Sequence, residues 1–232
     1  MTPRQRNRTV DWIAFTLLAI TTLGAGVAAN TAVFGLLRGI LLAPLPFERP
    51  ERLVKVDVRS GQGYLISLSV PNFCDWRERN RSFGSFGASA GWDVILTGKG
   101  PAAWLPARQV LGDWFQTLGL RAETGRLFDG RETEPGRPPV AVLGHAAWTS
   151  RFGGDPGIVG QGIVLDGRTY TVVGVLAPGA GYPDATVEVY LSLGTLAAEL
   201  PWDKRSSSFG LSAVGRLRPG LTPAAARDDL AR

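Results

Sequence analysis

The sequence predicts an α+β fold, in which an N-terminal transmembrane helix precedes a mixed α/β extracytoplasmic domain. Three observations predict it. Residues 12–37 form a run of 26 positions without a formal charge, longer than the ~20 apolar residues that a helix needs to cross a bilayer. Short runs of alternating apolar and polar residues follow, as is typical of strands. Short stretches with helix-capping residues lie between these runs, so helices and strands are interspersed.

The composition indicates a folded protein and disfavours several functional classes. The chain has 232 residues, of which 44% are hydrophobic and 19% charged, values typical of a globular protein. Its net charge of +5 is spread along the chain, and no zinc-finger or RNA-binding spacing indicates a nucleic-acid partner. Cys74 and His145 are the single residues of their types. No intrachain disulfide can form, and no metal site is expected.

The N-terminal segment is predicted to anchor the chain in the inner (cytoplasmic) membrane. Its first eleven residues include Arg4, Arg6 and Arg8, and basic residues beside a span tend to stay cytoplasmic. We expect a basic cytoplasmic tail over 1–11, a single membrane helix with its stalk over 12–43, and an extracytoplasmic bulk. A helix over 12–42 is roughly 45 Å long, so it would protrude beyond the ~30 Å hydrocarbon core. Pro44 and Pro46 are expected to end it.

Two features of the span admit alternatives. Gly24, Gly26 and Ala28 are a candidate helix-packing patch, because small residues let a second helix approach closely. Glycine and alanine are also simply common in membrane helices. A secretory signal peptide, cleaved before Asn30, has the same order of basic, apolar and small-residue regions. The apolar stretch continues a further dozen residues, which favours an uncleaved anchor.

The remainder of the chain, residues 47–232, is predicted to form one domain of many strands and short helices. Asp166-Gly167 stands between two β-branched runs, and this pair is typical of a tight hairpin whose turn needs positive φ. Ser69 and Thr222 are expected to cap helices that begin with early prolines. The expected strands are 53–58, 83–97, 104–110, 140–143, 163–173 (as the hairpin), 187–191 and 211–217. The expected helices lie at 69–80, after Gly112, at 145–152 and from Thr222 onward.

No catalytic constellation is apparent, and neither catalytic nor cofactor-binding residues are predicted. A phosphate-binding loop of the G-x-x-x-x-G-K-[ST] type is absent, as is a G-x-S-x-G nucleophile elbow. Cys74 is interpreted as a small core residue, and His145 as a packing or capping residue. Five acids are candidates for a carboxylate pair, although solvated surface acids are the expected interpretation: Asp75, Glu78, Asp129, Glu132 and Glu134.

Several strings resemble a known family, the MacB-type ABC permeases, and most closely their duplicated orphan group. Residues 29–34 (Ala-Asn-Thr-Ala-Val-Phe) and 41–47 (Leu-Leu-Ala-Pro-Leu-Pro-Phe) resemble the end of the first membrane helix. Residues 69–76 are similar to the S-x-P-D-F-x-D-W segment, with Asn72 in place of the usual Asp. Residues 151–175 form the most recognisable block, and 217–220 (Leu-Arg-Pro-Gly) also fit. The resemblance covers roughly residues 12–232.

The resemblance implies a fold and a function. In FtsX- and MacB-like permeases a first membrane helix leads into a periplasmic core domain of two subdomains, and three further helices follow. A separate cytoplasmic ABC ATPase dimerises on ATP, and the permease relays that motion to the periplasmic domain for export, including efflux, or for envelope processes. Implied partners are this ATPase, a periplasmic adaptor or substrate, membrane lipid, and a second copy or permease half.

The sequence departs from the family pattern in two places. The basic helix before the first span is reduced to eleven residues, and helices two to four are absent from these 232 residues. A fragment or truncated product, with the core domain incomplete at its C-terminal end, is therefore expected. The alternative functions are a non-transporting, membrane-anchored periplasmic binding or scaffold domain and, with a cleaved signal peptide, a secreted enzyme.

Overall fold

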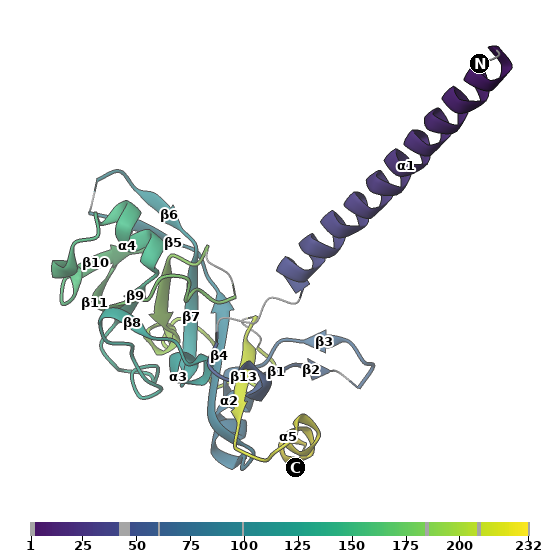
Figure 1. Ribbon diagram of the computed structural model, residues 1–232. Helices are drawn as coiled ribbons and strands as arrows, with labels where there is room; N and C mark the ends of the chain where they lie inside the picture. The colour runs from purple at the N-terminus through teal and green to yellow at the C-terminus, as the bar shows by residue number, and fades with distance from the viewer. Residues whose placement is uncertain are drawn as a thin grey trace. The chain divides into compact units, whose positions relative to one another are not determined.

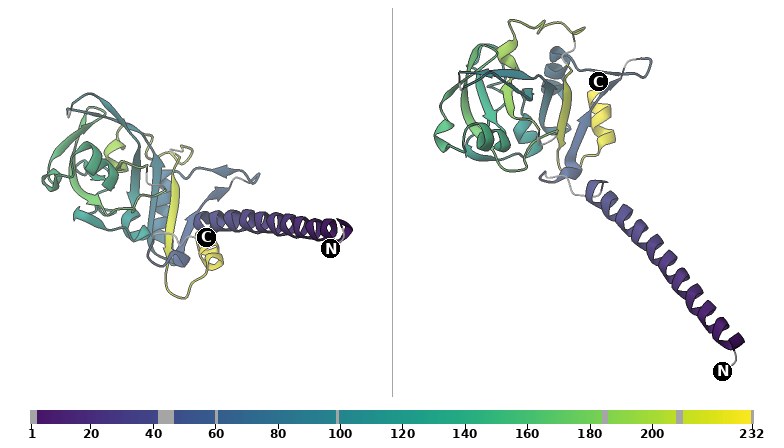
Figure 2. Two further views of the ribbon diagram at one scale, coloured as in Figure 1. Left: turned by 45° about the horizontal axis from the view of Figure 1, so that its top comes forward. Right: turned by 90° about the horizontal axis from the view of Figure 1, so that it is seen from above.

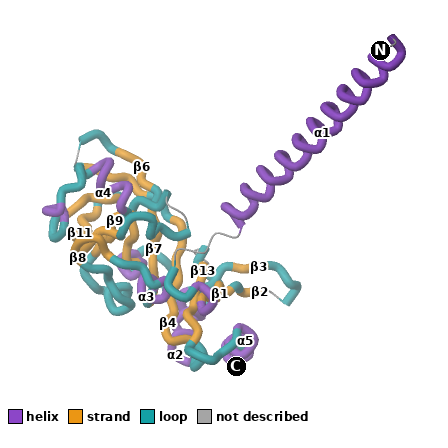
Figure 3. Tube along the Cα trace, viewed as in Figure 1, coloured by secondary structure: helices purple, strands orange, loops and turns teal. Residues whose placement is uncertain are grey.

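The computed structural model describes residues 3–41, 47–59, 61–98, 100–183, 186–207 and 210–231. The chain divides into two compact units, Met1–Leu45 and Pro46–Arg232, and each is described by itself. Figure 1 shows a lone helix for the first and a strand-rich body for the second. Figure 3 shows that the helices of the second unit are short and lie between strands, so its class is α+β as predicted.

The first unit is one helix, α1 (Pro3–Leu41). It begins before the expected start at Trp12, because proline is tolerated in a first turn and no helix breaker follows Pro3. Within it, Phe15–Gly35 is long and apolar enough to cross a membrane, a judgement of length and composition alone. The expected helix-ending residues Pro44 and Pro46 lie outside the described residues.

Four threonines interrupt the apolar sequence of α1, yet their hydroxyls are satisfied within the helix. Thr16, Thr21, Thr22 and Thr31 each donate to the carbonyl four residues earlier, over 2.7 to 2.9 Å. A bilayer offers no water to an unpaired polar group, so each must find its partner inside the segment. These four threonines are therefore compatible with a lipid surrounding.

The second unit contains thirteen strands and four α-helices among the described residues. The strands are β1 (Leu53–Val56), β2 (Val58–Arg59), β3 (Leu65–Ile66), β4 (Phe83–Gly91), β5 (Val94–Thr97), β6 (Ala103–Leu105), β7 (Ala107–Gly112), β8 (Ala122–Gly125), β9 (Val140–Leu143), β10 (Gly162–Leu165), β11 (Arg168–Leu176), β12 (Val189–Ser192) and β13 (Ser212–Leu217). The helices are α2 (Val70–Arg79), α3 (Trp114–Leu118), α4 (His145–Arg151) and α5 (Pro223–Leu230).

Most strands join one mixed sheet in the order β1-β13-β4-β7-β12-β9-β11-β10-β5-β6, with β8 added beside β11. β9 and β12 stand in the middle and are buried on both faces, which explains their short, almost wholly apolar sequences. β13 pairs antiparallel with both β1 and β4. These two neighbours therefore run in the same direction, and α2 is the connection that crosses between them.

Three apolar clusters form the core of the second unit. One is formed by side chains of β5, β6, β9, β10, β11 and β12, with Ala107 of β7 and Ile158. A second holds α2 and α5 against β4 and β13, with Phe73 fully buried at its centre. Figure 2 shows α5 beside β1 in both views. The third surrounds α3 and joins Trp114 and Phe115 to Tyr190.

Most local predictions are confirmed. The Oγ of Ser69 accepts from the N–H of Asn72 and caps α2, and the hydroxyl of Thr222 caps α5 in the same way. Asp166 and Gly167 have φ of 49° and 77° and connect β10 to β11 as the predicted hairpin. The left-handed residue Gly119 ends α3.

The expected strand over residues 53–58 is wrong in one respect. It divides into β1, which joins the large sheet, and β2, which leaves that sheet to pair with β3. The alternating pattern continues through Val58, so it could not reveal that the chain changes partners. The side chains of Tyr64, Leu65 and Ile66 are 70%, 60% and 50% exposed. Exposure of successive residues shows that neither face of β3 packs on the body of the domain.

Candidate functional site

Four of the five acids that were candidates for a carboxylate pair are instead held by arginines, and the fifth, Glu78, is exposed on α2. Asp75 binds Arg79 at 2.8 Å and Arg205 at 2.7 Å. The hydrogen bond from Arg205 lowers the pKa of the Asp75 carboxyl. A carboxylate held in this way by two cations is a poor proton acceptor, so Asp75 is not suited to acid–base chemistry.

The three acids of the 126–139 loop follow the same pattern. Glu132 makes a two-pronged contact with Arg126, and its carboxylate also accepts from the N–H of Asp129. This pairing with Arg126 lowers the pKa of Glu132. Asp129 pairs with Arg131, which lowers the pKa of Asp129, and Glu134 pairs with Arg137. These contacts order the loop.

The single cysteine and histidine do not form a reactive pair. Cys74 is half-buried against the α2 cluster, and burial raises the pKa of its thiol, which suppresses the nucleophilic thiolate. His145 begins α4 and meets Trp148 edge-on, with ring centroids 5.5 Å apart. Among the described residues no group of three or more His, Cys, Asp or Glu side chains gathers as a metal site would.

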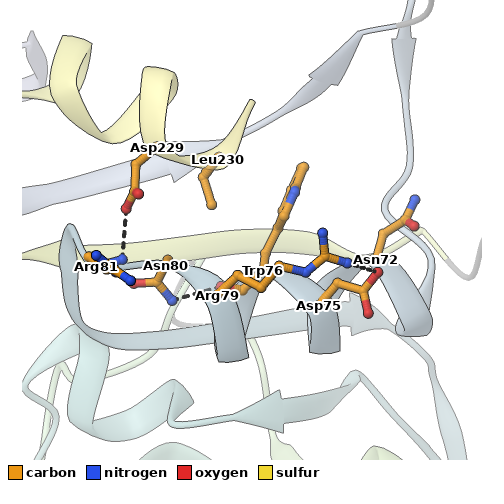
Figure 4. A pocket seen from close by; sticks show the side chains of 8 residues that line it. All are labelled: Asn72, Asp75, Trp76, Arg79, Asn80, Arg81, Asp229 and Leu230. Carbon is orange, nitrogen blue, oxygen red and sulfur yellow. Dashed lines mark hydrogen bonds and ion pairs between the residues drawn. The ribbon is translucent and has the colours of Figure 1, made fainter. Parts of the chain in front are cut away.

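A small polar pocket of about 300 Å³ lies between α2 and α5 (Figure 4). Asp75 and Arg79 line it from α2, and Asp229 lines it from α5. The carboxylate of Asp229 accepts from the N–H groups of Arg81 at 2.7 Å and Ser82 at 2.9 Å. In Figure 4 Leu230 and Trp76 face each other across the pocket. Asp229 thus ties α5 to the residues that follow α2, while Asp75 and Arg79 pair with each other within α2.

A second groove, of about 440 Å³, runs between β1 and α5. Val54, Val56 and Val58 line it on the strand side, and Ala226 and Leu230 on the helix side. β1 is the first strand in the order of the sheet. Its outer edge is therefore unpaired among the described strands.

Several side-chain hydrogen bonds tie down the segment through which the chain enters the second unit, residues 47–52, here called the lead-in segment. The Nη1 of Arg216 donates to the carbonyl of Glu48 at 2.6 Å, and its Nε donates to the carbonyl of Thr117 at 2.8 Å. Arg52 donates through Nε to the carbonyl of Leu217 at 2.8 Å. Sequence reasoning missed Arg216, because one arginine in an alternating strand carries no distinguishing signal.

The candidate helix-packing residues lie on α1 in open surroundings. Added Cβ atoms at Gly24 and Gly26 would meet nothing within 4 Å, and Ala28 is exposed. The structure contains one chain, so a helix that would use this patch is not present to test it. Gly24, Gly26 and Ala28 therefore stay a prediction.

Fold and surface together define a class of protein, a strand-rich domain joined to one candidate membrane helix. The acids described above form ion pairs within the domain. The sequence model of one protein family, the MacB-like periplasmic core domain, matches residues 16–232. The chain belongs to this family. No curated protein matches the chain. The family is a component of ABC-type transporter permeases, and these systems pair with ATPases.

Two solved structures show the shared fold. The periplasmic region of MacB from Actinobacillus actinomycetemcomitans is 15% identical with a TM-score of 0.59, over 77% of this chain and 80% of that chain. The extracellular domain of the noncanonic ABC-type transporter YknZ from Gram-positive bacteria is 13% identical with a TM-score of 0.56, over 76% and 88%. The predicted α+β fold and the resemblance to MacB are thus confirmed.

Proposed function

We propose that this chain is the membrane-anchored portion of an ABC transporter permease of the MacB/FtsX type. It relays motion of a separate cytoplasmic ATPase to its extracytoplasmic domain, for export or for an envelope process. One observation carries the proposal. The family match begins at residue 16, inside the candidate span Phe15–Gly35, and continues through the whole domain. Helix and domain therefore belong to one family unit.

The same observation favours a retained anchor over a cleaved signal peptide. A leader cut before Asn30 would remove residues that the family match includes. The basic residues Arg4, Arg6 and Arg8 support a cytoplasmic N-terminus, and we propose that α1 anchors the chain in the inner membrane with the domain outside the cytoplasm. Mass spectrometry of the mature N-terminus tests this directly. A polypeptide that begins at Asn30 and is recovered in the soluble fraction without detergent contradicts the anchor.

The relay function requires partners, and the chemistry of the domain supports a mechanical role. Four of the five acids that might have acted as a catalytic pair are bound to arginines instead. We propose no catalytic residue, a cytoplasmic ABC ATPase as the first partner, and a periplasmic adaptor or substrate as the second. A second copy or permease half would pack on Gly24, Gly26 and Ala28.

Affinity purification of the full chain from its native membrane tests the central claim. Retention of an ABC ATPase, with a distance between labels on α1 and α4 that changes on ATP addition, supports the relay. A chain that binds a periplasmic ligand but retains no ATPase contradicts it, and indicates the non-transporting scaffold instead.

A further inference from the structure

The lead-in segment is fastened to the second unit by a guanidinium that reaches three parts of the chain. Arg216 projects from β13 and donates to the carbonyls of Glu48 at 2.6 Å and Arg49 at 3.5 Å. Its Nε donates to the carbonyl of Thr117 in α3 at 2.8 Å. One side chain thus joins the lead-in segment, α3 and β13. A guanidinium is charged at neutral pH, and hydrogen bonds from charged donors are stronger than those between neutral groups.

Further contacts hold the two ends of the same segment. Phe47 meets Tyr182 edge-on with ring centroids 5.4 Å apart, and Tyr182 in turn contacts Trp114 at 5.6 Å. At the other end Arg52 donates to the carbonyl of Leu217 at 2.8 Å. The segment is thereby tied into the α3 cluster at its start and to β13 at its end.

Close packing reinforces these ties. A Cβ added at Gly119 would lie 3.3 Å from the Cβ of Glu48 and 3.4 Å from the Nη2 of Arg216. Burial and the neighbouring Arg52 lower the pKa of Arg216. The guanidinium is thus half-buried between protein segments, with its Nη2 atom shielded from solvent.

These ties reach β13, which lies between β1 and β4 at one end of the large sheet. β13 pairs with β1 on one side and with β4 on the other. The α3 helix packs beneath the same strands, with the backbone of Trp114 against Gly87 of β4. A displacement of the lead-in segment is therefore transmitted to β13, the middle strand of β1-β13-β4. It is transmitted to α3 as well.

We propose that Arg216, with Arg52, is a force-bearing clamp through which movement of α1 is transferred to the second unit as a rigid-body displacement. This inference rests on the proposed relay function and names the residues that would perform it. Because the acceptors in the lead-in segment are backbone carbonyls, the clamp depends on the arginines and tolerates a side-chain change at position 48.

Single-molecule pulling on the full chain in a nanodisc tests the clamp in two geometries, both in a Cys74→Ala background. In the first, force acts between the N-terminus and an attachment at Ser150→Cys on α4. In the second, force acts between Glu78→Cys on α2 and Ser150→Cys, so that it crosses the body without passing through the lead-in segment. Glu78 and Ser150 are both exposed. A loss of general stability would affect both geometries, whereas loss of the clamp affects the first alone.

Arg216→Lys is expected to detach the lead-in segment about tenfold faster at fixed force in the first geometry, because lysine cannot span the separate carbonyls. The second geometry should change by less than about twofold. Arg218→Lys is the matched control: Arg218 follows β13 and donates to the carbonyl of Phe83 at 3.1 Å rather than to the lead-in segment. It should leave both rates nearly unchanged.

An unchanged rate for Arg216→Lys in the first geometry overturns the clamp, and so does equal acceleration in both geometries. If Arg216→Lys does not fold, Arg52→Lys is measured in the same way, and the same pattern is expected of it. The assay contains no ATPase. A failure of ATPase co-purification would therefore overturn the relay function while leaving this measurement valid, and the two failures are distinguishable.

Discussion

Asp166 and Ile95 exchange two hydrogen bonds across the junction of β10 and β5. The N–H of Asp166 donates to the carbonyl of Ile95 at 3.0 Å, and the N–H of Ile95 donates to Oδ1 of Asp166 at 2.8 Å. The residue that makes the hairpin turn, with φ of 49°, thus also attaches the hairpin to the neighbouring strand.

Two substitutions of Asp166 test its contribution to stability, as a residue with positive φ and as a hydrogen-bond acceptor. Asp166→Ala should destabilise the domain by about 1–2 kcal/mol, because alanine is strained at positive φ and offers no acceptor. Asp166→Asn keeps both properties and should cost less than about 0.5 kcal/mol. Urea unfolding of the full chain in detergent, followed by tryptophan fluorescence, measures the difference. Equal midpoints for the two variants would contradict this account.

Gly87 of β4 lies directly against the backbone of α3. A Cβ added there would be 2.6 Å from Cα and 2.7 Å from N of Trp114. Gly87→Ala should therefore destabilise the domain by about 3 kcal/mol, since main chain must shift. Gly91→Ala in the same strand is the control, because an added Cβ meets nothing within 4 Å. Thermal unfolding compares them, and a Gly91→Ala variant as unstable as Gly87→Ala would show that strand propensity, not contact, is responsible.

The Arg126–Glu132 pair makes part of the stability depend on pH. The folded protein lowers the pKa of Glu132 below its ordinary value of 4.5, so the pair stabilises the domain fully above pH 4.5. This contribution is lost as the pH falls through the lower, folded-state pKa. Glu132→Gln should cost about 1–2 kcal/mol at pH 7, and the difference from the original chain should shrink below pH 4.5.

Denaturant unfolding from pH 3 to pH 7 gives this difference. Glu134→Gln serves as the control, because the Arg137–Glu134 contact spans 3.4 Å with both side chains about half exposed, and such pairs contribute little. A Glu132→Gln difference that is constant over this range would refute the assignment.

The small-residue patch of α1 predicts helix association. The double variant Gly24→Ile/Gly26→Ile should weaken association of the full chain in nanodiscs about tenfold, because bulky side chains hold the backbones apart. Leu18→Ile is the control, since at about 100° per residue position 18 lies roughly 80° or more around the helix from Gly24, Gly26 and Ala28. Energy transfer between labelled copies measures association. If the double variant and the control associate alike, the patch is not the contact.

Local sequence patterns predicted the individual elements well but not their partners. Ser69 and Thr222 cap helices because their hydroxyls reach amides three residues ahead, a relation contained within a few residues. The division of residues 53–58 between two sheets, and the ties of Arg216 to Glu48 and Thr117, involve residues far apart in sequence. No periodicity encodes such contacts, because they depend on how β13 is placed beside β1.

The sequence by itself determined that the chain has an apolar N-terminal helix, an α+β body and a MacB-like character, because hydropathy, caps and turn residues act over short distances. Only the tertiary structure decided that four of the five candidate acids are bound to arginines and that one arginine of β13 holds the lead-in segment. Those are properties of side chains brought together from distant positions, and their physical origin is the order of the strands in the sheet.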